Sequence, residues 1–416
     1  MKRLVAATAV ALGALACGGA PPAPPAPEPS GLPVVSPAAA GFDSAALARV
    51  VEYLKAEVDS GAFPGAVVAV GRPGRLALLA AVGHYGVDDT WPVDPATIYD
   101  LASLTKVVGL TSAALLLVTD GRLGLDDPVA RWVPAFRGPR KERVTVRHLL
   151  THSSGLPAWA PLFRAAKTRA AAFAVVDSTT LLRAPGDTFV YSDLGAIVLT
   201  QIVERAAGEP LDRFLARRVF GPLGMGATRY LPPGAWHHRI APTEVDSAWR
   251  KRLLRGEVHD ENAGRLGGVS GHAGLFSNAP DLARFASWML TIHAGAPAGA
   301  RGSAEGSPPA GAEPPVPDAA LVREFTTRQG IPARSTRALG WDTPSDSGYS
   351  SAGTAMSRRA FGHTGFTGTS LWIDPDRDLF VILLTNRVNP TRANTRILQV
   401  RPRVADLAVG ALKSDQ

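Results

Sequence analysis

The feature that most constrains the fold is an apolar segment in the first third of the chain. Residues 107–118 read VVGLTSAALLLV, with no proline and with no glycine after Gly109. The segment has ample length for a buried helix. Directly before it, Ser103 and Lys106 are separated by two residues. If Ser103 stands in the first turn of this helix, the two side chains lie on one face, a turn apart.

The Ser103 and Lys106 pair is compatible with nucleophilic chemistry. A serine hydroxyl is a poor nucleophile until a neighbouring group takes its proton. Lys106 meets that need if burial lowers the pKa of its amine and keeps it partly neutral. The helix N-terminus adds free N–H groups and partial positive charge where an oxyanion would form. The alternative is an ordinary helix start, with Ser103 or Thr105 near the cap and Lys106 extended to water.

The composition fits a folded protein and gives no support for a nucleic-acid partner. The 416 residues are 46% hydrophobic and 19% charged, which is compatible with a sizeable core. The net charge is +8, but the arginines are scattered and form no basic run or reader motif. We interpret the charge as an aid to solubility and to attraction by an anionic envelope. The single cysteine, Cys17, excludes an intrachain disulfide.

Residues 1–17 have the pattern of an export signal. Lys2 and Arg3 precede an uncharged apolar stretch that is too short to span a bilayer. Cys17 ends this stretch, and the arrangement resembles a bacterial lipoprotein signal, in which the cysteine becomes the lipidated first residue. Ala14 departs from that pattern, since a larger aliphatic residue is usual there, so an ordinary cleaved signal is the alternative. Either interpretation predicts a secreted protein, periplasmic or in the cell envelope.

Two further segments are predicted to lie outside the compact fold. Residues 18–40 are rich in proline and alanine and suit a tether between a membrane anchor and a folded domain that begins near Gly41. Residues 294–317 are rich in Ala, Gly, Pro and Ser and predict a disordered surface loop.

The remaining chain, 41–416, predicts an α/β (α+β) domain. A helical pattern at 42–60 precedes two strand-like runs around Arg72-Pro73-Gly74, the signal of a hairpin. Residues 127–267 are mostly helical in pattern. Strands at both ends with helices between them predict an antiparallel sheet of N- and C-terminal strands, flanked by helices, with an inserted all-helical subdomain. Later elements are predicted as helices at 278–293 and 392–412 and strands at 369–375 and 379–386.

Three short motifs occur in order along this domain. They are Ser103-Leu104-Thr105-Lys106, Tyr191-Ser192-Asp193, and His363-Thr364-Gly365 within FGHTGFTGTSLWIDP. Together with the stretch HLLTHSSGLP, they resemble the motifs of the serine β-lactamase and penicillin-binding protein superfamily. The resemblance is to its class C-like branch, with D-alanyl-D-alanine carboxypeptidases, D-aminopeptidases and related esterases. It extends from about Gly41 to the C-terminus and implies a β-lactamase/transpeptidase-like fold.

The resemblance implies a role for each matched position. Ser103 would be the nucleophile that forms an acyl-enzyme, and Lys106 and Tyr191 would share its proton. The motif His363-Thr364-Gly365 would lie on an edge strand and dock the substrate's backbone. The backbone N–H groups of Ser103 and Phe366 would form the oxyanion hole. The resemblance implies no cofactor, and a small-molecule or peptide substrate that contains an amide or ester.

Two positions depart from the penicillin-processing members that the chain resembles. Asp193 stands where Asn is usual, and a carboxylate cannot donate a hydrogen bond as an amide does. It would instead hold Lys106 charged and shift the role of base to Tyr191. His363 stands where Lys is usual, and a histidine is charged only part of the time near neutral pH. Both changes argue against an efficient β-lactamase and leave peptidase and esterase activity open.

A cluster of polar residues at 258–276, VHDENAGRLGGVSGHAGLF, raises the question of a metal site. Its spacing matches no helical pair of ligands, and its glycines predict a tight crossing of backbones, so we predict no metal. In the resembling family this segment lines one wall of the cleft. The cluster consists of His259, Asp260, Glu261 and His272.

The remaining residues of interest are two histidines and three tryptophans. We expect His148 and His152 to serve packing and capping. Trp159, Trp236 and Trp341 would either edge the pocket or pack in the core.

Two hypotheses of function follow from the sequence. The first is a secreted serine hydrolase that cleaves an amide or ester through a Ser103 acyl-enzyme. Cell-wall D-peptides fit the predicted compartment, and small esters fit the His363 variant. The second is a non-catalytic relative that binds peptidoglycan or another partner, against which the intact Ser103, Lys106 and Tyr191 count.

Overall fold

The structure is a computed structural model that describes residues 31–295 and 315–413. The predicted export signal, Cys17 and most of the predicted tether therefore lie outside the described residues, as does most of the predicted loop at 294–317. Within the described ranges, no helix is both long and apolar enough to cross a membrane.

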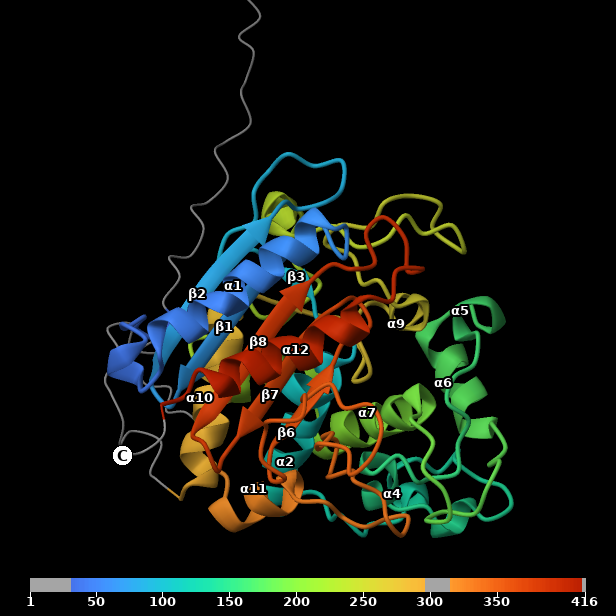
Figure 1. Cartoon of the computed structure of the whole chain (residues 1–416). Helices are drawn as coiled ribbons and strands as arrows, with labels where there is room; N and C mark the ends of the chain where they lie inside the picture. Colours follow the sequence, from blue (N-terminus) through green and yellow to red (C-terminus); the bar gives the residue numbers. More distant parts are fainter. Residues whose placement is uncertain (1–30, 296–314, 414–416) are drawn as a thin grey trace, which may run out of the picture.

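A five-stranded antiparallel sheet forms the centre of the molecule (Figure 1). Its strand order, β2-β1-β8-β7-β6, places two N-terminal strands beside three C-terminal ones, which confirms the predicted sheet. The junction is the pairing of β1 with β8, in which Ala66 stands opposite Thr385. The strands are β1 (Gly65–Arg72), β2 (Arg75–Gly83), β6 (Phe361–Thr364), β7 (Ser370–Asp374) and β8 (Leu379–Thr385).

Helices cover both faces of this sheet. Alternate residues of β1 face opposite cores, since successive side chains of a strand point to opposite sides. Val68 and Val70 pack into the core that α1 and α12 close, whereas Val67 and Ala69 pack into the larger core that includes α10. The predicted helix at 392–412 begins later, at Ile397. The helices are α1 (Ser44–Asp59), α10 (Ala279–His293), α11 (Ala319–Thr326) and α12 (Ile397–Gly410).

The predicted helical region packs beside the sheet as a separate lobe (Figure 1). It is interrupted by β4, a strand of two residues, which pairs with β5 and so joins a small sheet of order β3-β5-β4. Two residues are too few to produce an alternating pattern in a sequence. The small sheet consists of β3 (Tyr99–Asp100), β4 (Arg229–Tyr230) and β5 (Leu275–Ser277). The α-helices are α3 (Val129–Trp132), α4 (Val146–Leu150), α5 (Leu162–Ala165), α6 (Arg169–Ser178), α7 (Asp193–Ala207), α8 (Leu211–Leu215) and α9 (Glu261–Arg265). The 3-10 helices η3 (Lys141–Arg143) and η5 (Gly234–Arg239) and the π-helix η4 (Ala216–Phe220) lie between them.

The folded part begins earlier than the expected Gly41. Leu76 of β2 donates its N–H to the carbonyl of Pro33 and accepts the N–H of Val35, each at 2.9 Å. A proline lacks an N–H but keeps its carbonyl as an acceptor. The last residues of the predicted tether therefore pair with β2, which is the outer strand of the sheet. A short turn, η1 (Ala38–Ala40), follows.

Candidate active site

The apolar segment forms the predicted buried helix, with Ser103 at its start. The helix continues as a π-helical turn, η2 (Lys106–Thr111), and then as α2 (Ser112–Thr119). Ala102, just before Ser103, has a φ of 46°, a conformation that is unfavourable for a residue with a side chain. The strained residue and the π turn therefore flank the expected nucleophile, and such features cluster at functional sites.

Lys106 is buried beside Ser103, with a carboxylate as its partner. Its Nζ atom lies 3.0 Å from Ser103 Oγ, 2.7 Å from Asp193 Oδ1 and 3.0 Å from the carbonyl of His272. Burial opposes the charge, but Asp193 and Tyr191 outweigh it and raise the pKa of Lys106 above its ordinary value. The side chain is 3% exposed, so it does not extend to water. The geometry favours a charged Lys106 over a neutral one that acts as the base.

Tyr191 stands over the same ammonium group. The centre of its ring lies 4.9 Å from Lys106 Nζ, and its buried hydroxyl has no hydrogen-bond partner within the described residues. His152 packs against the ring, with centroids 4.6 Å apart, and its Nδ1 accepts the N–H of Ser192 at 3.1 Å. His152 therefore has the expected packing role, and the ring that it supports is that of Tyr191.

His363 lies on β6, which is an edge strand as expected, and its ring is buried. Burial, and then the charges of Arg337 and Lys106, lower the pKa of His363 well below its ordinary value. Nδ1 lies 2.8 Å from the carbonyl of Thr364, so this nitrogen carries the proton and donates it. Nε2 is then an acceptor, without a partner in the described part of the chain. The expectation that His363 is charged part of the time is therefore wrong, because burial and the two neighbouring cations favour its neutral form.

The turn after β6 is pressed against the segment that precedes the nucleophile. A Cβ atom on Gly365 would lie 2.3 Å from the carbonyl oxygen of Leu101, so only glycine fits there. Thr369 closes the same contact, donating its hydroxyl to that carbonyl at 3.0 Å. Phe366 follows Gly365 and is half-exposed. The two N–H groups expected to form the oxyanion hole, those of Ser103 and Phe366, therefore belong to segments in direct contact.

Two cavities meet at Ser103 and Tyr191. The first has a volume of about 450 Å³ and includes the whole third motif in its wall. The second, of about 440 Å³, lies beside Asp193 and contains the half-exposed Trp159. Phe366 also lines both cavities. The structure thus brings all the expected site residues of the folded domain to one cleft, namely Ser103, Lys106, Tyr191, Asp193, His363, Thr364, Gly365 and Phe366.

Three arginines of the first cavity were not foreseen from the sequence. Arg401 of α12 is buried and donates to the carbonyls of Gly365 and Thr369. Burial lowers the pKa of Arg401 to about 10. Arg387 and Arg337 also line this cavity. The three residues come from separate segments without a shared motif, so no spacing in the sequence could have identified them.

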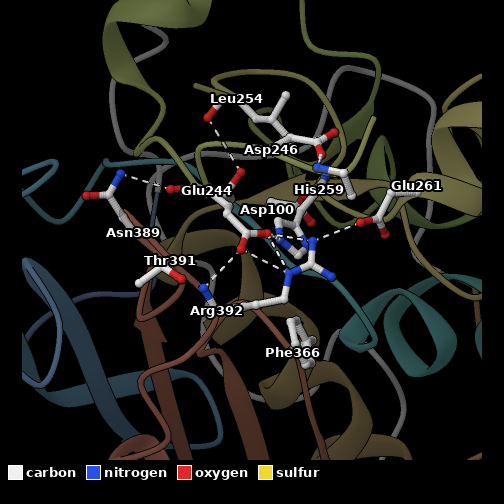
Figure 2. Close-up of polar contacts among 12 residues, drawn as sticks. Asp100, Glu244, Asp246, Leu254, His259, Glu261, Phe366, Asn389, Thr391 and Arg392 are labelled. Carbon is white, nitrogen blue, oxygen red and sulfur yellow. Dashed lines mark hydrogen bonds and ion pairs between the residues drawn. The ribbon is translucent and has the colours of Figure 1, made fainter. Parts of the chain in front are cut away.

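The ionisable side chains of the polar cluster at 258–276 have close partners. His259 Nε2 lies 2.8 Å from Glu244, and His272 Nε2 lies 2.9 Å from Asp260. Figure 2 shows Arg392 beside Glu244 and Glu261, with the Phe366 ring next to it. In the described ranges, no three His, Cys, Asp or Glu residues are grouped so as to hold a metal ion.

The remaining expectations for this region concern packing and capping. A Cβ on Gly274 would lie 2.5 Å from the carbonyl oxygen of Gly268, which is the expected close crossing of backbones. His148 completes a capping box with Thr145 at the start of α4. Trp341 lies in the core, and Trp236 packs against a small cluster away from the two cavities.

Comparisons with known proteins identify the family and the fold of this chain. The profile of the family described as Beta-lactamase matches residues 50–404. A protein of Salmonella schwarzengrund named "Putative D-alanyl-D-alanine carboxypeptidase" is 30% identical, and the match covers 88% of each chain. A penicillin-binding protein homologue from Caulobacter crescentus has a similar fold, with a TM-score of 0.67 and 21% identity over 88% of this chain and 98% of that one. The hydrolase EstCE1, described as having promiscuous acyltransferase activity, has a TM-score of 0.65 and 23% identity over 87% of this chain and 99% of that one.

Proposed function

The chain belongs to the Beta-lactamase family and is a serine hydrolase, and from this premise we propose that it cleaves its substrate through an acyl-enzyme on Ser103. Ser103 Oγ attacks the carbonyl carbon, and its proton passes to the oxygen of Tyr191, which acts as a phenolate in this step. The ammonium group of Lys106, 4.9 Å from the centre of the Tyr191 ring, supplies the positive charge beside this phenolate. The N–H groups of Ser103 and Phe366 stabilise the oxyanion. Collapse of the tetrahedral intermediate breaks the bond to the leaving group, which takes the proton from Tyr191. Water then hydrolyses the ester that links the acyl group to Ser103.

We propose further that the substrate is a peptide that ends in a free carboxylate, as in D-alanyl-D-alanine. The observation that carries this proposal is the first cavity, whose wall contains Arg337, Arg387 and Arg401 together with Ser103. Arg337 Nη1 and Arg401 Nε are buried without partners in the described part of the chain, so they are free to donate to a carboxylate. The name of the Salmonella relative points to the same class of substrate.

A panel of four substrates tests both proposals on the full chain. It contains a D-Ala-D-Ala peptide with a free C-terminus, the same peptide with a C-terminal amide, a p-nitrophenyl ester and a chromogenic cephalosporin. We expect kcat/KM for the free acid to exceed that for the amide by about tenfold or more, since charge-assisted hydrogen bonds are worth about 1.5–3 kcal/mol. The variant Arg337→Gln should reduce this preference. Arg334→Gln, an exposed neighbour, is the matched control.

The outcomes of this panel separate the hypotheses. Ser103→Ala should abolish turnover and covalent labelling by a fluorophosphonate, and retained labelling would refute the role of Ser103. Equal turnover of acid and amide, with faster turnover of the ester, would replace the peptide proposal with an esterase. No acylated species by mass spectrometry with any substrate would favour the non-catalytic relative.

We propose that the chain is exported and anchored to the cell envelope by a lipid on Cys17. The support is the signal-like pattern of 1–17 with the cysteine at its end. Bacterial cells that express the full chain should incorporate a labelled fatty acid into it, and Cys17→Ala should remove the label. A soluble, unlabelled, periplasmic product from the original sequence would instead indicate an ordinary cleaved signal.

A further inference from the structure

The two N–H groups assigned to the oxyanion hole stand on segments far apart in the sequence. Ser103 follows β3, and Phe366 lies in the turn between β6 and β7. An oxyanion hole stabilises charge only if its donors are held at fixed positions before the reaction. A group that contacts both segments could therefore fix the two donors relative to each other.

Asp100, at the end of β3, holds the segment that carries Ser103. Its Oδ1 accepts the N–H of Ala102 at 2.8 Å. Ala102 is the residue with a φ of 46°, so this hydrogen bond stabilises the strained backbone immediately before Ser103. The carboxylate is 2% exposed, and water does not compete for this contact.

Asp100 also contacts the segment that carries Phe366. Its carbonyl accepts the hydroxyl of Thr367, the residue after Phe366, at 2.8 Å. The second carboxylate oxygen accepts the N–H of His259 at 2.6 Å. The His259 ring in turn stacks on the ring of Phe366, with centroids 5.7 Å apart and planes 26° from parallel.

The other contacts of His259 and Phe366 hold the same arrangement in place. The carboxylate of Glu244 contacts both the His259 ring and Arg392 (Figure 2). The guanidinium group of Arg387 stands 4.4 Å from the centre of the Phe366 ring and donates to the Phe366 carbonyl at 2.8 Å. Phe366 is thus fixed at its backbone and at its ring, although the ring is half-exposed.

We infer that Asp100 is a positioning residue that sets the distance between the two donors of the oxyanion hole. One oxygen fixes the backbone before Ser103, and the carbonyl and the second oxygen fix the turn around Phe366 directly and through His259. Neither of the two cavities at Ser103 includes Asp100 in its wall, so we assign it a positioning role and not a catalytic one. The inference rests on the proposed acyl-enzyme function.

The test uses Asp100→Asn and Thr367→Val in the full chain. An amide offers one acceptor oxygen where the carboxylate offers two, so Asp100→Asn breaks either the link to Ala102 or the link to His259. Thr367→Val keeps the shape of the side chain and removes only the hydroxyl that binds the Asp100 carbonyl. Asp374→Asn is the matched control, because Asp374 is also buried and accepts backbone N–H groups, at the end of β7 away from the turn.

The readout compares a p-nitrophenyl ester with its thionoester, in which sulfur replaces the carbonyl oxygen. A well-placed oxyanion hole favours the oxygen substrate, and a loosened one discriminates less. We expect Asp100→Asn to lower kcat on the ester by about tenfold or more, with little change in KM, and to lower the preference for oxygen by a similar factor. The carbonyl stretch of the acyl-enzyme should move to higher frequency. Thr367→Val should shift both quantities in the same direction by a smaller factor, and Asp374→Asn should shift neither.

Each outcome shows whether Asp100 positions the two donors of the oxyanion hole. If Asp100→Asn does not fold, Thr367→Val alone decides it by the oxygen preference and the carbonyl stretch. An unchanged preference and stretch in the folded variants would overturn the inference, even if their melting temperatures fall. If the unaltered chain turns over none of the four substrates of the panel, the proposed function is overturned, and the inference with it.

Discussion

At the scale of single residues, Lys106 shows how one contact decides a chemical role. Burial of an ammonium group favours its neutral form, which is the form a general base requires. Asp193, 2.7 Å away, reverses that preference and raises the pKa of Lys106. A carboxylate at this position therefore assigns Lys106 the role of a fixed charge beside Tyr191.

Asp193→Asn tests this assignment. Without the carboxylate, burial dominates and the pKa of Lys106 falls, so the amine loses its proton at a lower pH. We expect the alkaline limb of the kcat/KM profile to move down by about one pH unit or more. Asp212→Asn, which changes an acid in the first turn of α8, is the control for lost helix-dipole interactions. A gain of activity near pH 7 in Asp193→Asn would instead identify a neutral Lys106 as the base.

At the scale of elements, the turn between β6 and β7 depends on close contact with the segment before Ser103. Gly365→Ala places a methyl group 2.3 Å from the Leu101 carbonyl, so the turn must move and take Phe366 with it. We expect kcat on an ester to fall by about a hundredfold, the usual cost of one oxyanion donor. Gly226→Ala, where a Cβ meets nothing within 4 Å, should change kcat by less than about twofold. Equal kcat values for the two variants would show that the turn does not position the donor.

The elements also show what the sequence could and could not predict. The buried helix after Ser103 and the sheet of N- and C-terminal strands were predictable, because each depends on a long local pattern of apolar residues. The π-helical form of η2 was not, since it produces no separate periodicity. The cluster of Arg337, Arg387 and Arg401 was not predictable either, because it exists only after three distant segments have packed together.

At the scale of the whole molecule, a buried acid links the lobe to the helices behind the sheet. Asp281, in the first turn of α10, accepts the N–H of Ala227 and the hydroxyl of Thr228, each at 2.8 Å. Burial raises the pKa of Asp281 to about 6, although these hydrogen bonds oppose the rise. The unfolded chain, with an ordinary aspartate pKa near 4, gives up this proton at a lower pH than the native state does.

This difference predicts how stability depends on pH. Between about pH 4 and 6 the native state binds more protons than the unfolded state, so the free energy of unfolding falls as the pH rises through this range. Each unit of pKa is worth about 1.4 kcal/mol, so the loss from Asp281 is on the order of 3 kcal/mol and persists above pH 6.

Asp281→Asn keeps an oxygen to accept both hydrogen bonds and has no charge to bury. At each pH, the difference between the free energies of unfolding of the variant and of the original chain cancels the contributions of the other titrating groups. Asp281→Asn should gain stability relative to the original chain from pH 4 to 6, and this gain should then level off. Asp318→Asn, at the exposed N-cap of α11, is the control for the same substitution at an exposed acid. A stability difference for Asp281→Asn that does not change with pH would mean that burial at this junction imposes no cost on the charge of this carboxyl.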